Sequence, residues 1–137
     1  MDRAAQDVAM ELGLPCGGWC PKGRRAEDGA IPAKYQLEET PSLDYRQRTE
    51  WNVRDSDGTL ILTVGPVSGG TALTVEFAEK HNCPHLVMDL ATEPPAEAAR
   101  RWIEQNRIRI LNVAGPRESN QPGIYDLAAV VLRRLLV

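Results

Sequence analysis

The second half of the chain alternates between short apolar runs and amphipathic segments. Residues 59–64 are apolar or β-branched without interruption, which predicts a strand buried on both of its faces. The runs 86–90 and 108–113 predict two further strands. Three helices are expected between and after these runs, because apolar positions recur at intervals of three and four. Their apolar residues are Leu73, Phe77 and Ala78; Ala98, Ala99, Trp102 and Ile103 after Pro94-Pro95; and Ile124, Leu127, Ala128, Val131 and Leu135.

The first half of the chain is more polar and contains fewer clear elements. Residues 2–12 predict a helix that Asp2 caps and Gly13 ends, because apolar residues recur there at helical spacing. Residues 14–19 predict at best a short strand, since proline and glycine weaken it, and residues 20–41 predict a loop. A polar helix is predicted from residue 43 to residue 54, where the turn Asp55-Ser56-Asp57-Gly58 ends it.

Strands that alternate with helices indicate parallel pairing through right-handed crossovers. The expected fold class is α/β, a three-layer Rossmann-like sandwich whose mostly parallel sheet has about four or five strands. The chain has 137 residues, so we expect residues 1–137 to form a single Rossmann-like ligand-binding domain. The chain opens on a helix, whereas the first strand of a doubly wound sheet usually lies near its middle. We therefore expect a slot in the sheet, a strand from another chain, or a rearranged strand order.

Composition excludes several classes of protein. Sixteen Lys and Arg against nineteen Asp and Glu give a net charge of −3, which argues against a dedicated nucleic-acid binder. No apolar run approaches the roughly 20 residues that cross a bilayer, and the N-terminus lacks a signal-peptide pattern, so we expect no membrane partner. Three cysteines form no disulfide framework and favour a reducing compartment. The predicted location is the cytoplasm.

The loop after the first predicted strand, residues 65–71, has the composition of an anion site. Glycines such as Gly69 and Gly70 allow a ligand to approach the backbone, and the following helix offers free N–H groups to a phosphate. Ser68 and Thr71 add hydroxyl donors. The alternative interpretation is an ordinary strand-to-helix turn with a Ser or Thr cap.

The loop after the last predicted strand, residues 115–123, is the second candidate. Its nine residues exceed the usual connection of about two to six, and long loops tend to carry function. Beyond Gly115, Arg117 could hold a phosphate, Ser119 could donate a hydrogen bond, and Glu118 could position Arg117. A solvated turn with an incidental ion pair is the alternative. Both loops must open on one edge of a parallel sheet, so we expect them to converge.

Other clusters carry weaker signals. Lys22, Arg24 and Arg25 form a compact basic group that could guide an anion or simply be solvated. The residues Cys16, Cys20, His81, Cys83 and His85 match no standard zinc spacing, and Asp55-x-Asp57-Gly58 lacks the remaining ligands of a calcium loop, so no protein-coordinated metal is expected. Ser68 does not stand in a nucleophile-elbow pattern, and the two histidines make a Ser-His-acid triad improbable.

Several motifs, in one order along nearly the whole chain, resemble the molybdenum cofactor carrier family. The motifs are WCPKGRRAEDG at 19–29, YRQRTEWNV at 45–53, SGGTALT at 68–74 and GPRES at 115–119. The resemblance implies a Rossmann-like fold, similar to that of the LOG or lysine-decarboxylase-like phosphoribohydrolases, and self-association as a dimer or tetramer. It also implies a ligand such as molybdenum cofactor (molybdopterin), another phosphorylated pterin or a nucleotide, held without chemical change.

The sequence departs from this family at two places. Family members usually begin with a strand and a Gly-Gly-Gln-Thr-Gly loop before Asp-Arg-Ala-Ala, whereas here Met1 directly precedes Asp2 and Arg3. Either the true start lies upstream, or the first family strand and half of the usual pocket are missing, with Asp2 and Arg3 as the remnant. The related enzymes carry a catalytic Glu three residues beyond the Thr of the glycine motif. That position here is Thr74, with Glu76 displaced by two.

The leading hypothesis is a cytoplasmic carrier for molybdenum cofactor or a related phosphorylated ligand, with no catalytic residue. The predicted phosphate-binding residues are Ser68, Gly69, Gly70, Thr71, Gly115, Arg117 and Ser119. The predicted rim residues are Asp2, Arg3, Lys22, Arg24, Arg25, Arg48, Asn52 and Glu118. One alternative is a LOG-like nucleoside monophosphate phosphoribohydrolase that uses Glu76 or Glu118 as general acid/base. The other is a self-associating remnant without a ligand site.

Overall fold

The computed structural model describes residues 2–26, 29–92 and 96–136. Its main sheet has three parallel strands in the order β6-β5-β7. The strands are β5 (Gly58–Thr63), β6 (His85–Asp89) and β7 (Leu111–Ala114). Thr59 on β5 aligns with His85 on β6 and with Asn112 on β7. All residues of β5 are buried, in agreement with its uninterrupted apolar and β-branched sequence.

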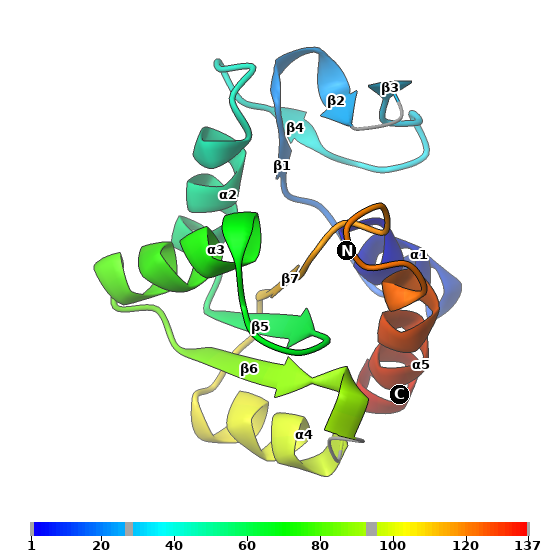
Figure 1. Ribbon diagram of the computed structural model, residues 1–137, viewed down its shortest axis with the longest axis vertical. Coiled ribbons are helices and arrows are strands. Elements are labelled where there is room, and N and C mark those ends of the chain that lie inside the picture. Colours follow the sequence, from blue (N-terminus) through cyan, green and yellow to red (C-terminus); the bar gives the residue numbers. More distant parts are fainter. Residues whose placement is uncertain (1, 27–28, 93–95, 137) are drawn as a thin grey trace.

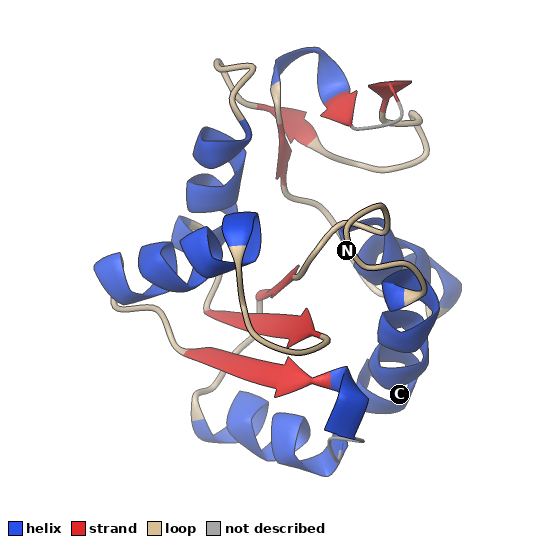
Figure 2. Cartoon of the chain, viewed as in Figure 1, coloured by secondary structure: helices blue, strands red, loops and turns tan. Residues whose placement is uncertain are grey.

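Helices cover both faces of this sheet and give the fold three layers (Figure 1; Figure 2). On one face, Leu60 and Leu62 belong to an apolar cluster with residues of α1 (Asp2–Glu11), α4 (Ala96–Gln105) and α5 (Ile124–Leu136). On the other face lie α2 (Tyr45–Arg54) and α3 (Gly69–Lys80), where Val53 packs against Phe77. The expected α/β Rossmann-like sandwich is therefore confirmed.

The remaining strands lie in the amino-terminal segment, by which we mean residues 14–54. β1 (Trp19–Cys20) pairs in parallel with β4 (Glu38–Glu39), and β2 (Arg25–Ala26) pairs antiparallel with β3 (Gly29–Ala30). The 3-10 helix η1 (Lys22–Arg24) precedes β2, and a second one, η2 (Leu90–Thr92), follows β6. The described parallel strands are thus divided between a three-stranded and a two-stranded sheet, rather than joined in one.

Polar side chains hold the amino-terminal segment together. The Arg24 guanidinium donates to the backbone carbonyls of Ile31, Pro32, Tyr35 and Leu37 at 2.7–3.2 Å. The Asn52 carboxamide from α2 accepts from the Trp19 backbone N–H at 2.8 Å and donates to the Trp19 carbonyl at 3.2 Å. A segment whose sequence predicts only a loop therefore acquires a defined path, because charged and amide groups satisfy its backbone.

Three features differ from what the sequence predicts: the start of β7, the buried face of α5 and the structure of residues 20–41. β7 begins at Leu111 rather than at residue 108, because the Asp57 carboxylate accepts the N–H groups of Arg109 and Ile110 at 3.0 and 2.9 Å. On α5, Leu127 is 46% exposed, whereas Leu132, outside the predicted apolar stripe, is fully buried. Short strands occur within residues 20–41, where a loop is expected. The pair Pro94-Pro95 lies outside the described residues.

None of the described helices is both long enough and apolar enough to span a bilayer.

Candidate functional site

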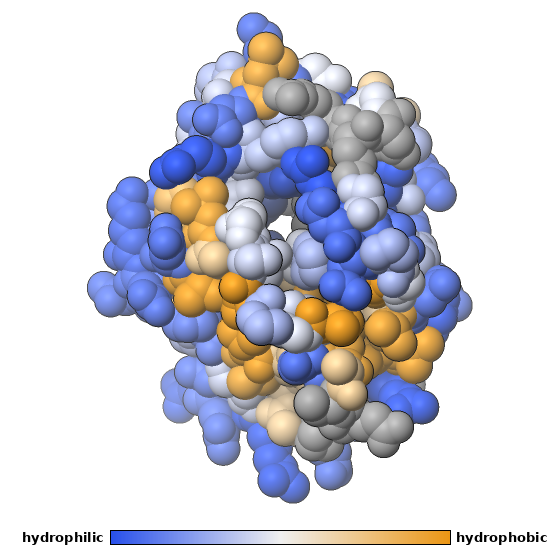
Figure 3. Space-filling view, viewed as in Figure 1, coloured by the Kyte–Doolittle hydropathy of each residue, from blue (hydrophilic) through white to orange (hydrophobic). Residues whose placement is uncertain are grey.

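A cavity of about 1060 Å³ opens between the main sheet and the amino-terminal segment. It lies at the carboxyl ends of β5 and β7, where Thr63, Val64 and Ala114 form part of its floor. Figure 3 shows the corresponding hollow in the middle of one face of the molecule. Ligands of open α/β sheets bind at this edge, so the cavity is the candidate site.

The first glycine-rich loop supplies one wall of the cavity. Asp89, at the end of β6, accepts the Gly65 backbone N–H at 3.1 Å, which holds the turn where Gly65 has a φ of 79°. Ser68 is the N-cap residue of α3, and its side chain makes no capping hydrogen bond. Within the described part of the chain, the N–H groups of Gly69 and Gly70 have no backbone acceptor. The first turn of α3 therefore directs free donors and the positive end of its dipole into the cavity.

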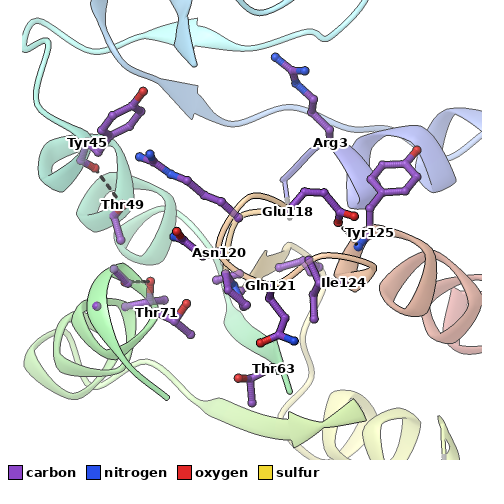
Figure 4. A pocket seen from close by; sticks show the side chains of 18 of the residues that line it. Arg3, Tyr45, Thr49, Thr63, Thr71, Glu118, Asn120, Gln121, Ile124 and Tyr125 are labelled. Carbon is purple, nitrogen blue, oxygen red and sulfur yellow. Dashed lines mark hydrogen bonds between the residues drawn. The ribbon is translucent and has the colours of Figure 1, made fainter. Parts of the chain in front are cut away.

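The loop after β7 supplies the opposite wall. Figure 4 shows Glu118, Asn120 and Gln121 around the cavity at the base of this loop. Glu118 accepts the backbone N–H groups of Gly123 and Tyr125, at 2.6 and 2.9 Å, and so ties the loop to the start of α5. These two hydrogen bonds hold the pKa of the Glu118 carboxyl below its usual value of 4.5. Glu118 is consequently a carboxylate that fixes the loop, and a poor general acid.

The third wall comes from α2 and carries an aromatic ring that is in contact with two cations. The Arg117 guanidinium lies 4.4 Å from the centre of the Tyr45 ring, and that of Arg48 lies 5.4 Å from it. Tyr45 begins α2 after the cap residue Asp44, whose side chain accepts the Arg46 backbone N–H. Cation–π contacts thus connect the loop after β7 with the amino-terminal segment across the cavity.

The end of the cavity beside α1 contains a tyrosine–aspartate pair. The Tyr125 hydroxyl donates to Asp7, and this hydrogen bond, with burial, raises the pKa of Tyr125 to about 12. Arg3 lies nearby on α1, 5.9 Å from the centre of the Tyr35 ring. Four arginines line the cavity in all: Arg3, Arg46, Arg48 and Arg117. Although the chain carries a net charge of −3, this cavity is rich in cations.

Most of the predicted site residues lie around this one cavity. The lining includes Ser68, Gly69, Gly70, Thr71, Gly115 and Arg117, together with Arg3, Arg48, Asn52 and Glu118. The two loops expected to converge do so. Ser119, Lys22 and Arg24 are not among the lining residues. The side chains of Asp2 and Arg25 are outside what the structure describes. Ligand binding by the lining residues remains a prediction.

Several predicted roles need correction. Arg24 binds four backbone carbonyls and shapes the amino-terminal segment instead of guiding an anion. Glu118 binds backbone N–H groups with both carboxylate oxygens and so caps α5, a role that the sequence did not predict. That Glu118 also positions Arg117 stays a prediction. Glu76, the other acid considered for a hydrolase, is exposed on α3 and does not line the cavity.

Sequence reasoning missed the aromatic and amide part of the site. The missed lining residues include Tyr45, Thr49, Asn112, Asn120, Gln121 and Tyr125. Tyr45 and Thr49 belong to the motif 45–53, and the spacing of four residues on a polar helix could have indicated a shared face. Tyr125 meets Asp7 only through the packing of α1 on α5, for which no local signal exists. Across the described residues, no three His, Cys, Asp or Glu side chains gather as a metal site.

Comparisons with known proteins identify the family of this chain. A search of curated protein sequences found no match. The chain resembles a crystal structure from Syntrophus aciditrophicus SB, named "Putative molybdenum carrier protein", with a TM-score of 0.93 and 46% sequence identity. The match covers 98% of this chain and 87% of that one. A model of the circularly permutated YpsA SLOG family matches residues 1–136. The chain therefore belongs to the circularly permutated YpsA SLOG family.

Proposed function

We propose that this chain is a carrier that binds molybdenum cofactor, or a closely related phosphorylated pterin, without converting it. The observation that carries the proposal is the first turn of α3, whose free N–H groups at Gly69 and Gly70 open into a cavity lined by arginines. Backbone donors at a helix N-terminus favour a phosphate group. The Syntrophus relative, which is named a molybdenum carrier, supports molybdenum cofactor as the cargo.

In this proposal the phosphate rests on the first turn of α3 and the ring system lies toward α2. Arg117, 4.4 Å from the Tyr45 ring centre, lines the same cavity as Gly69 and Gly70, and in this proposal it turns toward the bound phosphate. Tyr45 then offers its ring face to a planar pterin. Tyr125 closes the far end with a hydroxyl that donates its hydrogen to Asp7 and can therefore only accept from the ligand.

Binding without conversion follows from the carboxylates of the site. Those that line the cavity are Asp7, Glu118 and Asp126. Asp7 accepts the Tyr125 hydroxyl, and Glu118 accepts two backbone N–H groups, so neither is positioned as a proton donor to a ligand. The third carboxylate, Asp126, is exposed in the first turn of α5. A phosphoribohydrolase needs such an acid at the glycosidic bond, and we therefore expect no cleavage of nucleotides.

Calorimetric titration tests the proposal directly. Molybdopterin under anaerobic conditions is expected to bind, and AMP is expected to bind more tightly than adenosine, which lacks the phosphate. Arg117→Ala should weaken molybdopterin binding by about 1.5–3 kcal/mol, because it removes a charge-assisted hydrogen bond. Lys22→Ala, an exposed cation outside the cavity, is the matched control and should bind normally. Equal binding by the Arg117→Ala variant and the wild type would contradict the assignment of Arg117.

A second variant separates binding from folding. Gly70 has open space where a Cβ would stand, so Gly70→Ala creates no clash within the protein. Alanine in the first turn should leave stability unchanged or slightly raised, while its methyl group crowds the proposed phosphate position and weakens binding. Release of adenine during incubation with AMP would instead identify a hydrolase.

A further inference from the structure

The candidate cavity carries hydrogen-bond acceptors at the end beside α1. Asp7 on α1 and Tyr125 on α5 line the cavity there, and both side chains are half-buried. Asp7 stands one helical turn after Arg3, so the two share the face of α1 that borders the cavity. Figure 4 shows Thr71, in the first turn of α3, and Tyr125 on opposite sides of the cavity. A ligand that reaches across the cavity therefore meets backbone N–H groups at one end and acceptor oxygens at the other.

The tyrosine decides which atoms of this pair a ligand can use. The Tyr125 hydroxyl donates its hydrogen to Asp7 Oδ2. This hydrogen bond, with burial, raises the pKa of Tyr125 to about 12, so the hydroxyl keeps its proton at neutral pH. Among the described residues, no other group donates to the Asp7 side chain, and its Oδ1 keeps its lone pairs for a ligand. The pair thus offers a ligand acceptors only.

Two adjacent acceptors suit a ring edge that carries two adjacent N–H groups. The 2-amino-4-oxo ring of a pterin has such an edge, formed by its ring N3–H and its 2-amino group. In molybdopterin this edge lies at the end of the molecule away from the phosphate. Guanine has the same edge at its N1–H and 2-amino group, whereas adenine presents a nitrogen lone pair beside its 6-amino group. A site built to accept N–H groups discriminates strongly against a ring that lacks them.

We propose that Asp7 is the specificity-determining residue of the site and selects a ligand with a 2-amino-4-oxopyrimidine edge. The Asp7 carboxylate accepts the ring N–H and the 2-amino group, and Tyr125 is the positioning residue that orients this carboxylate. The inference rests on the proposed function, because a phosphate at the first turn of α3 sets which end of the ligand reaches Asp7. It adds the chemical class of the ring, which the arginines and the N–H groups of α3 do not define.

Calorimetric titration with three nucleotides tests this inference. GMP carries both N–H groups, IMP lacks only the 2-amino group, and AMP presents a lone pair in place of the ring N–H. GMP should bind about tenfold more tightly than IMP, because it makes one more charge-assisted hydrogen bond, and AMP should bind most weakly. Equal affinities for the three nucleotides, or no binding of GMP up to about 1 mM, would overturn the inference.

The nucleosides show which of the two proposals has failed. If the three nucleotides bind equally but each binds more tightly than its nucleoside, the phosphate site stands and the role of Asp7 is wrong. If no nucleotide binds more tightly than its nucleoside, the proposed function is wrong, and the orientation on which the role of Asp7 depends fails with it. Tighter binding of GMP than of molybdopterin would support Asp7 as the selecting residue and contradict a pterin as the cargo.

A charge-to-amide variant makes the test specific. Asp7→Asn replaces one acceptor oxygen by an NH₂ group, which opposes the N–H groups of guanine and matches the lone pair of adenine. It should lower the affinity for GMP about tenfold and leave AMP bound equally or more tightly. Glu11→Gln makes the same exchange on α1 outside the cavity and should keep the wild-type preference. An unchanged ratio of GMP to AMP affinity in Asp7→Asn would overturn the inference, and the wild-type series decides alone if this variant does not fold.

Discussion

The three-stranded sheet and the amino-terminal segment are held together by different interactions. In the sheet, Leu60, Ile61 and Leu62 are completely buried and pack against helices on both faces. In the amino-terminal segment, the strands have two residues each, and the backbone path depends on hydrogen bonds from Arg24 and Asn52. One region is stabilised chiefly by burial of apolar surface and the other by charged and amide groups.

This difference explains why the candidate site lies where the two regions meet. The main sheet supplies rigid strand ends and the first turn of α3, which require precise packing. The amino-terminal segment supplies Tyr45, Arg46 and Arg48. These three side chains stand on the polar helix α2, so the position of that one helix places them at the cavity. A cavity between an apolar and a polar region can expose donors and cations without opening the core to water.

The largest expected effect comes from the apolar region. Leu60→Ala should lower the free energy of unfolding by about 2–5 kcal/mol, because it leaves a cavity at a fully buried position. Urea denaturation measures the change. Ile110→Ala, at a position that is 60% exposed, is the control and should change stability by less than about 0.5 kcal/mol. Similar losses in both variants would contradict burial of apolar surface as the main source of stability in the sheet.

A smaller and more local effect is expected from the polar region. Arg24→Ala removes the hydrogen bonds to four carbonyls and should destabilise the amino-terminal segment by about 2 kcal/mol. Limited proteolysis should then cut within residues 30–42 before the sheet unfolds. Arg24→Lys should fail to restore protection, since an ammonium group lacks the planar fork of donors. Simultaneous unfolding of the whole chain would show instead that the two regions are not separable.

The smallest effect is expected at Glu118, whose hydrogen bonds join the loop after β7 to the start of α5. The pKa of Glu118 is lowered in the folded protein, so its contribution to stability is present above the usual value of 4.5 and is lost as the pH falls through the lower folded value. Glu118→Gln should therefore melt below the wild type at pH 7, and the difference should shrink on acidification. A difference in melting temperature that stays constant down to pH 3 would contradict this role.

The difference between the main sheet and the amino-terminal segment also explains which features can be predicted from the sequence. β5 and the helices after it follow from apolar runs and periodicity, and the loops at Gly69 and Arg117 follow from the rule that parallel strands end at one edge. The role of Arg24 could not be predicted, because a basic residue in a polar loop gives no sign that it binds carbonyls. The predicted start of the last strand, residue 108, differs from the observed start of β7 for a similar reason. The hydrogen bond from the Arg109 N–H to Asp57 joins residues that are far apart in the sequence, so no local pattern indicates it.

The missed residues of the site share one physical cause. Tyr125 and Asp7 come from opposite ends of the chain and meet through the packing of α5 on α1. Asn112 is a polar residue within an apolar strand, and its Nδ2 donates to Thr59 at 3.3 Å, which its position in the run did not indicate. Tertiary contacts between distant residues carry no local pattern, so only the folded arrangement identifies them.

The central claim is that the first turn of α3 holds the phosphate of the cargo. A crystal structure of the protein with bound molybdopterin measures this directly. Phosphate oxygens within about 2.7–3.2 Å of the Gly69 and Gly70 backbone nitrogens, with Arg117 turned toward them, are the predicted result. Density for the phosphate at any other surface, with the first turn of α3 left in contact with solvent, would contradict the account.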